Sequence, residues 1–232
     1  MKKLSLLLGG VVLSTMVMAQ KPTEGAPLSL EGQLGLNSLG GGTELKFNAP
    51  ALRLRYFVTD NIAVRLTVGL NNSKETFNAY ENADGTGATG TYEMKESMNT
   101  FAIGGEYHFA GTERLSPYAG LDIRFGMGGL KESGAEASFN GTDAVYALDY
   151  TEEFTAKTSM FGVNLVAGTD YYFAQNFYIG LELGLGFQAV TSKEATREIT
   201  VGGITATGVT PEYKTGFFGN NFIGNFRLGW RF

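Results

Sequence analysis

The sequence alternates apolar with small or polar residues over eight separate segments, and this period of two constrains the fold more than any other feature. In residues 177–187 every odd position is Phe, Ile or Leu, and every even position is Tyr, Gly or Glu. Successive side chains of a β-strand point to opposite faces, so this segment predicts a strand with two unlike faces. The other seven segments are LSLEGQLGLN, ALRLRYFV, IAVRLTVGLN, FAIGGEYHF, YAGLDIRFGMG, FGVNLVAGTDYYF and FIGNFRLGWRF. Their lengths are close to the roughly 9 to 11 residues of a tilted membrane strand.

Short and long connections alternate between these segments. The short ones are residues 59–61, 110–116 and 174–176, and the long ones are residues 72–98, 131–157 and 190–214. A brief connection around LGGGTELK follows the first segment. Membrane barrels made from one bacterial chain usually have an even number of strands, short periplasmic turns and longer extracellular loops. The sequence therefore predicts an all-β fold, an eight-stranded antiparallel up-and-down transmembrane β-barrel with both chain ends in the periplasm.

The N-terminal stretch MKKLSLLLGGVVLSTMVMAQ has the features of a secretory signal peptide. Two lysines precede an apolar run, and Val17 and Ala19 are the small residues before the cleavage position. The run is shorter than the roughly 20 residues of a spanning helix, so we expect cleavage rather than a retained anchor. The predicted domains are a signal peptide, residues 1–19, and an outer-membrane β-barrel domain, residues 20–232. Export through the Sec pathway to the outer membrane of a Gram-negative cell is expected.

The composition argues against several classes of partner and site. Asp and Glu number 23 against 18 Lys and Arg, without a basic stripe, so nucleic acid is not an expected partner. The absence of Cys excludes a disulfide framework and thiolate metal sites. A single histidine and scattered acids such as Asp143, Asp149, Glu152 and Glu153 show no metal-ligand spacing. We therefore expect neither a metal nor a cofactor.

Glycines on the polar faces distinguish a membrane barrel from a soluble barrel or sandwich, in which the apolar face would turn inward. Glycine weakens the interior of a strand, and a water-facing surface has no need of it. The lumen of an eight-stranded barrel does need small residues, because it is only just wide enough for side chains. The glycines concerned are Gly35, Gly69, Gly104, Gly120, Gly126, Gly162, Gly168, Gly180, Gly184 and Gly186.

Aromatic residues gather near the short turns, where we expect their rings at the headgroup level of the membrane. They are Tyr56, Phe57, Tyr107, Phe109, Tyr118, Tyr171, Tyr172, Phe173, Phe177, Tyr178, Trp230 and Phe232. Together with the glycines, this predicted girdle favours the membrane barrel over the soluble alternative.

Charged residues on the polar faces form the main candidate site. The predicted lumen charge network consists of Arg53, Arg55, Arg65, Glu106, Asp122, Arg124, Asp170, Glu182, Arg227 and Arg231, and Glu31 faces the same side. One hypothesis is a lumen packed with paired charges, because buried charge is costly without a partner. The alternative is an ion or proton path, since ionisable groups at membrane depth often mark one. The narrow lumen favours paired charges and predicts a barrel closed to water flow.

The only histidine, His108, is predicted to face the lumen beside the turn at residues 110–116. A lipid A acylase or deacylase would need a histidine with a serine and an acid near the outer leaflet. The predicted topology places His108 at the opposite end. We therefore expect no catalytic residues and no enzymatic activity.

The long connections contain aromatics among Thr, Gly and acidic residues. They are Phe77, Tyr80, Tyr92, Phe139, Tyr146, Tyr150, Phe154 and Tyr213. One interpretation is that strands extend above the membrane and pair these aromatics across strands. The other is a recognition surface for a protein partner, because aromatics are enriched at interface cores and loops often carry function. The sequence does not separate the two.

The chain resembles the outer-membrane β-barrel domain family, the small eight-stranded barrels that include OmpA, OmpX and OmpW. The resemblance rests on the strand count, on RYFVTDNIAVRLTVGL and RLSPYAGLDIRFG, and on the C-terminal NFRLGWRF. That ending resembles the signal read by the barrel-assembly machinery, with Asn225 at its polar position and Trp230 and Phe232 at its aromatic positions. Arg227 departs from the pattern, in which Gly is usual. The resemblance implies insertion by that machinery.

The resemblance sets location better than task, because the family is functionally mixed. We expect a structural or interaction role, with the long extracellular loops as a recognition surface. A narrow conduit for small or apolar solutes is the alternative, and a lipid-modifying enzyme is a third hypothesis. The expected partners are outer-membrane lipid and lipopolysaccharide, the barrel-assembly machinery during insertion, and a protein bound through the loops.

Overall fold

The computed structural model describes residues 25–38, 45–47, 51–80, 86, 89–140, 143–219 and 224–232, so the predicted signal peptide lies outside the described residues. The strands are β1 (Leu28–Ser38), β2 (Leu45–Phe47), β3 (Ala51–Phe57), β4 (Ile62–Tyr80), β5 (Thr89–His108), β6 (Leu115–Asn140), β7 (Asp143–Ala174), β8 (Phe177–Ser192), β9 (Ala195–Val201), β10 (Ile204–Thr210), β11 (Tyr213–Gly219) and β12 (Gly224–Arg231). The part of the chain described here contains no helix long and apolar enough to cross a membrane.

Eight of these strands close into a ring. In order around it they are β1, β3, β4, β5, β6, β7, β8 and β12, and each pairs with its neighbours in the antiparallel sense. Closure comes from the first and last strands, whose register sets Leu30 opposite Trp230. The eight ring strands are the eight alternating segments of the sequence. The prediction of an eight-stranded up-and-down β-barrel is therefore confirmed.

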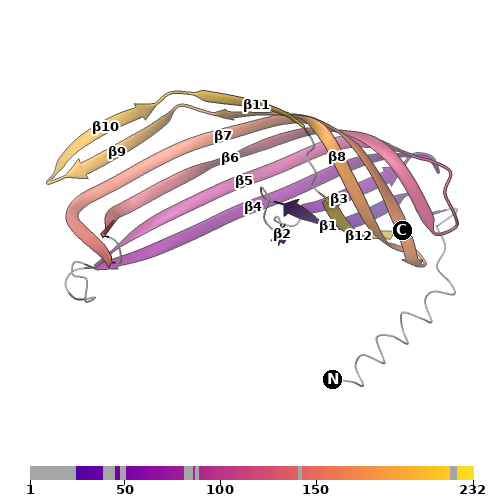
Figure 1. The fold of residues 1–232 in the computed structure, drawn as a ribbon, viewed down its shortest axis with the longest axis horizontal. Coiled ribbons are helices and arrows are strands. Elements are labelled where there is room, and N and C mark those ends of the chain that lie inside the picture. Colours follow the sequence, from indigo (N-terminus) through magenta and orange to yellow (C-terminus); the bar gives the residue numbers. More distant parts are fainter. Residues whose placement is uncertain are drawn as a thin grey trace, which may run out of the picture.

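The short connections and the C-terminus lie at one end of the barrel (Figure 1). In two of these turns a threonine hydroxyl, that of Thr59 or Thr112, accepts a hydrogen bond of 3.0 Å from the backbone three residues later. The third is the two-residue turn between β7 and β8, where Asn176 has a φ of 66°. Asn tolerates this left-handed conformation better than most residues.

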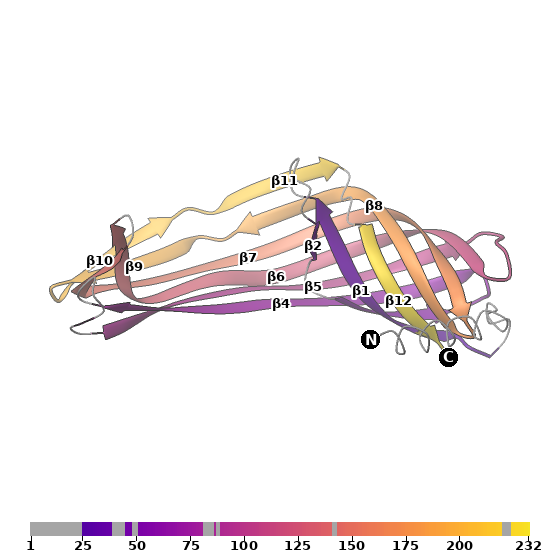
Figure 2. The same ribbon diagram turned by 60° about the horizontal axis from the view of Figure 1, so that its bottom comes forward.

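The prediction of long loops at the other end is largely wrong, because most of their described residues are strands. The hairpins β4–β5 and β6–β7 run far beyond the ring, and β9 and β10 add to the same surface (Figures 1 and 2). We call this surface the projecting sheet, residues 72–80, 89–98, 129–140, 143–157 and 195–210. In contrast, β11 pairs with β8 at residues 186–192. Phe77 and Tyr92 pair across it with ring centroids 6.4 Å apart, as the extended-strand interpretation requires. Residues 39–44 of LGGGTELK lie outside the described residues.

The two faces of the ring strands differ as the alternation predicts. Large apolar side chains cover the outside and stay exposed, including Leu52, Met127 and Leu165 at 60 to 62%. Such a continuous apolar surface suits lipid rather than water. The lumen side carries buried polar and charged groups.

The predicted aromatic girdle is correct only in part. Tyr56, Tyr107, Phe109, Phe177, Trp230 and Phe232 are exposed on the outer face. In contrast, Phe57, Tyr118, Tyr172 and Tyr178 are buried in the lumen. These four occupy the inward positions of their strands, so period-two alternation sends their rings away from the membrane.

Candidate functional site

A connected cluster of charged side chains fills the lumen. It contains four arginines and five carboxylates, each at most 5% exposed: Arg53, Arg55, Arg65, Arg227, Glu31, Glu106, Asp122, Asp170 and Glu182. All eight strands of the ring contribute to it. The alternation explains this local arrangement, because each residue stands at an inward position.

Arg55 connects three carboxylates on different strands. Its guanidinium lies 2.6 Å from Glu31, 2.8 Å from Glu106 and 2.8 Å from Asp170. Its Cζ also lies 5.0 Å from the ring centroid of Tyr178, within the range of a cation–π contact. A single side chain therefore bridges β1, β5 and β7.

Glu182 is the second centre of the cluster. Both of its oxygens accept hydrogen bonds of 2.9 Å from Arg53 in a bidentate pair, which is the stronger geometry for this pairing. Arg65 and the Tyr118 hydroxyl also donate to Glu182, at 2.8 and 2.6 Å. Arg65 in turn forms a bidentate pair with Asp122 at 2.7 and 2.6 Å.

The other members of the cluster lie between Arg55 and Glu182 and contact the remaining carboxylates. Arg227 lies 2.7 Å from Asp170 and 3.3 Å from Glu31. The Tyr178 hydroxyl donates to Glu31 at 2.7 Å and also contacts Ser29. Long side chains from opposite walls thus meet in the middle of the lumen.

The structure brings eight of the ten predicted network residues into this cluster, together with Glu31. The two others lie on the same face but differ in their contacts. Arg231 donates from Nε to the Ala26 carbonyl at 2.7 Å and covers the Phe57 ring. Arg124 is half-buried one inward position beyond Asp122.

Sequence reasoning missed the lumen hydroxyls that complete the cluster. Tyr118 and Tyr178 had been expected at the headgroup level, and Ser29 and Thr67 had no expected role, although Arg53 donates to the Thr67 hydroxyl at 3.0 Å. The alternation of the strands could have identified them. Each of the four is an even number of residues from a charged lumen residue on its own strand, so it lies on the same inward face.

Lumen glycines give this cluster its space. A Cβ at Gly168 would meet the Tyr118 ring, one at Gly180 would meet the Arg227 guanidinium, and one at Gly229 would overlap the Tyr178 ring. These contacts explain why the narrow lumen needs small residues: the space beside each glycine is filled by a large side chain of the cluster.

Replacing Gly229 by Ala is expected to lower the free energy of unfolding by about 1 to 3 kcal/mol, because the added methyl overpacks the lumen against Tyr178. Urea-induced unfolding in lipid vesicles measures this change. The matched control is Gly32→Ala on the outer face, where an added Cβ meets nothing within 4 Å. Equal stability of the two variants would contradict the account of the glycines.

His108 faces the lumen near the short turns, as the sequence predicted, and it lies between a serine and an acid. Its Nδ1 is 2.8 Å from Ser116 Oγ, and its Nε2 is 3.1 Å from Glu106. Ser116 and His108 are at most 1% exposed. Acyl transfer requires a substrate carbon beside the serine oxygen. Ser116 Oγ is buried inside the lumen against His108. Glu106 also pairs with Arg55, so His108 and Ser116 are connected to the charge cluster through Glu106.

The acidic residues considered for metal binding are only partly described by the structure. The described residues contain no group of three or more His, Cys, Asp or Glu side chains placed to hold a metal ion. Glu152 is paired with Arg197 instead. The side chains of Asp143 and Asp149 lie outside the described residues.

The two aromatic residues of the predicted assembly signal lie on the outer face beside the short turns. Trp230 stacks on Phe177 with ring centroids 6.0 Å apart, and it contacts Phe232 at 4.6 Å. The Phe232 backbone exchanges hydrogen bonds with Leu28, so the last residue is held by the first strand.

Solved structures of small barrels resemble the chain at low identity. The N-terminal β-barrel domain of Pseudomonas aeruginosa OprF is 15% identical with a TM-score of 0.38, and the match covers 90% of this chain and 100% of that one. Ail, the attachment invasion locus protein of Yersinia pestis, is 14% identical with a TM-score of 0.36, covering 88% and 96%. The outer membrane protein AlkL is 17% identical with a TM-score of 0.32, covering 92% and 94%.

Comparison of the sequence itself gives the family. No curated protein sequence matches the chain significantly. The model of the putative OmpA-OmpF-like porin family matches residues 45–191, which include six of the eight ring strands and most of the charge cluster. Since this match covers more than half of the chain, the protein belongs to the OmpA-OmpF-like porin family and is an outer-membrane β-barrel protein.

Proposed function

We propose that the protein has an interaction role, in which a closed barrel anchors the projecting sheet outside the cell for contact with a protein partner. The observation that carries this proposal is the exposed apolar surface of the β9–β10 hairpin. Ile204 is 77% exposed and its cross-strand neighbour Val201 46%. The hairpin lies beyond the lipid-facing band, because β9 pairs with β7 at residues 150–155. Apolar side chains in contact with water mark interaction sites when they gather in a patch.

The edge of the projecting sheet supports the same proposal. Among the described pairings β10 bonds only to β9, so its other side offers backbone donors and acceptors. An exposed edge strand is a template for another chain, which can add a strand and place side chains against the neighbouring surface. The partner we propose is therefore a protein with an extended apolar segment.

The filled lumen supports an anchoring role rather than a conduit. The cluster around Arg55 and Glu182 joins opposite walls by ion pairs of 2.6 to 2.9 Å. A conduit for small or apolar solutes would require these side chains to separate. The burial of Ser116 supports a role without catalysis.

Substitution of the exposed apolar residues of the β9–β10 hairpin tests the interaction role. We expect Ile204→Ser with Val201→Ser, which are cross-strand neighbours, to abolish recovery of a partner that is chemically crosslinked on intact cells and purified with the wild type. The matched control is Thr196→Ser with Thr207→Ser on the same hairpin, which keeps the apolar patch and should keep the partner. Recovery of the same partner by both variants would argue against this surface, and equal surface exposure of the variants checks their assembly.

We also propose that Sec-dependent export and insertion by the barrel-assembly machinery deliver the protein. The support is the exposed pair Trp230 and Phe232 beside the short turns. Pulse–chase measurement of insertion with and without Phe232 tests this route, and an unchanged rate and yield would reject the assembly signal.

A further inference from the structure

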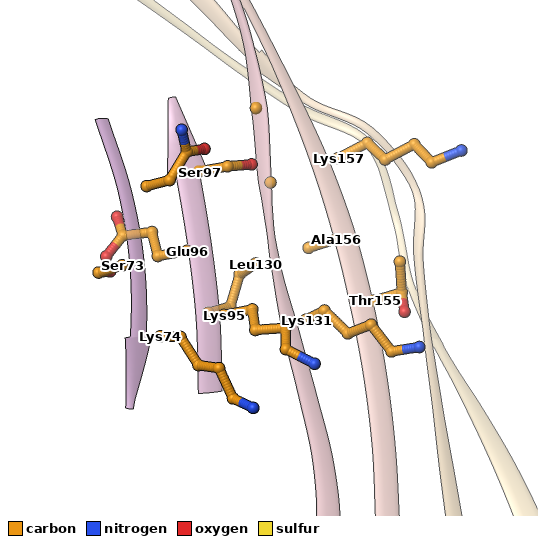
Figure 3. Close-up of a pocket in the computed structure, with 13 residues that line it drawn as sticks. Ser73, Lys74, Lys95, Glu96, Ser97, Leu130, Lys131, Thr155, Ala156 and Lys157 are labelled. Carbon is orange, nitrogen blue, oxygen red and sulfur yellow. The ribbon is translucent and has the colours of Figure 1, made fainter. Parts of the chain in front are cut away.

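Four lysines surround a groove on the outer face of the barrel wall, just beyond the lipid-facing band. Lys74, Lys95 and Lys131 are direct cross-strand neighbours on β4, β5 and β6. Lys157 follows on β7, opposite Gly129. All four share the outward parity of the exposed Leu70 and Met127 on these strands. The groove among them has a volume of about 510 Å³ (Figure 3).

Gly129 lies among the residues that line the groove, and a Cβ at this position would meet the backbone of Ala156. Around it the outward positions carry Asn72, Ser97 and Thr155, whose amide and hydroxyl groups line the groove with the lysines. Three of the lysine side chains extend to one side of it, and Glu96 points away from them (Figure 3). The groove thus combines hydroxyl-binding groups with a rim of ammonium groups.

The rim carries a surplus of positive charge. Glu93 pairs with Lys74 at 2.6 Å and Lys95 at 2.7 Å, and Glu153 pairs with Lys131 at 3.3 Å. Hydrogen bonds from Lys74 and then from Lys95 lower the pKa of Glu93 to about 2, so this carboxylate stays charged in physiological conditions. Two carboxylates therefore face four ammonium groups. Among the ion pairs of the described residues, Lys157 has none.

The position of the groove relative to the membrane follows from the register. Phe101, Phe125 and Phe161 form a lipid-facing row across β5, β6 and β7. The row with Leu70 and Met127 comes next, and the groove and its lysines follow. Lys74 is four residues beyond Leu70, which is about 13 Å along the strand at ~3.3 Å per residue. With a strand tilt of about 40°, this is about 10 Å of height, which takes the lysines from the lipid-facing band to the headgroup level.

We propose that this groove binds the phosphorylated saccharide headgroup of lipopolysaccharide in the outer leaflet. Each part of such a lipid meets its complement: acyl chains lie on the apolar band, sugar hydroxyls reach Asn72, Ser97 and Thr155, and phosphates meet the lysine rim. Lysine binds phosphate as a point charge, without the planar geometry that arginine imposes. The proposal depends on the outer-membrane location and not on the protein partner proposed above.

The test uses native mass spectrometry of the full-length protein in neutral detergent with purified lipopolysaccharide. We expect Lys74→Gln with Lys95→Gln and Lys131→Gln to weaken binding about a hundredfold, since each lysine near a charged lipid surface contributes about a fivefold effect. The control with the opposite expected effect is Glu93→Gln with Glu153→Gln. It removes two negative charges from the rim and should bind the lipid more tightly than the wild type. Lys214→Gln, an exposed lysine elsewhere, should change nothing.

Two further ligands identify the source of the phosphate. Dephosphorylated lipopolysaccharide should bind the wild type and the triple variant equally weakly, and millimolar inorganic phosphate should not displace the intact lipid. Equal binding of intact lipid by the wild type and the triple variant would overturn the proposal. So would displacement by inorganic phosphate, which would indicate a site for a free anion. Unchanged heat-modified electrophoretic mobility of each variant shows that its barrel is folded.

Discussion

Replacing Glu182 by Gln is expected to lower the free energy of unfolding by about 3 to 5 kcal/mol, because it removes one charge from a fully buried ion cluster. Glu182 is 3% exposed and accepts hydrogen bonds from Arg53, Arg65 and Tyr118. Gln keeps one acceptor oxygen but presents an NH2 group in place of the other, so Arg53 loses the bidentate pair and the opposing charge while remaining out of contact with water. The cost arises mainly from the cation left behind and less from the attraction lost.

The same substitution at an exposed ion pair is the matched control. Glu212 lies 2.9 Å from Lys214, and the two side chains are 48% and 71% exposed. Glu212→Gln should change the free energy of unfolding by no more than about 1 kcal/mol, because water screens both charges. Urea unfolding in lipid vesicles, followed by Trp230 fluorescence, measures both variants. A loss of less than 1 kcal/mol for Glu182→Gln would show that water reaches the cluster.

A double-mutant cycle measures the interaction energy between Arg65 and Glu182. Arg65→Ala removes a partner of Asp122, Glu106 and Glu182 together. Arg65→Ala with Glu182→Gln should cost less than the sum of the two single changes, because the second change removes a charge that the first left unpaired. Additive costs would indicate that the two residues do not share an environment.

The barrel could be predicted because its strands separate two different surroundings. Residues such as Leu183 face lipid and Glu182 faces the lumen, so burial and polarity alternate with every residue. The projecting sheet lacks this contrast. In residues 72–78 of β4 every residue is exposed, so no hydrophobic period marks the strand and the segment was interpreted as a loop. The remaining signal was the content of Thr, Tyr and Phe, which favours strands only weakly.

The lumen site could be predicted in its membership but not in its contacts. The parity of Arg55 and Glu106 places both inside, whereas their contact at 2.8 Å depends on the register of β3 against β4 and of β4 against β5. The lysine groove depends on register in the same way. Lys74, Lys95 and Lys131 are 21 and 36 residues apart in sequence and adjacent only after three strands are aligned. Aromatics add a further difficulty, since Tyr178 suits both a membrane interface and a buried hydrogen bond.

Planar bilayers containing the wild-type protein are expected to show no stable conductance. The ring has eight strands, and barrels of this size hold little more than their own side chains, whereas open aqueous channels belong to barrels of about 16 to 18 strands. Ion pairs from Arg55 and Arg65 to Glu106 cross this space at 2.8 and 3.0 Å. Passage of a hydrated ion would require these pairs to separate inside the barrel, where charge separation is most costly.

The companion variant replaces a matched pair, Arg53→Ser with Glu182→Ser, so that the net charge of the lumen is unchanged while two long side chains are removed. We expect this variant to show discrete openings that the wild type lacks, because water then fills the space that the bidentate pair occupied. Heat-modified electrophoretic mobility checks that the variant is folded before recording. Long-lived, ion-selective openings of the wild type would overturn the closed-lumen account and favour the conduit, since a barrel that conducts with its cluster intact must hold those charges apart in water.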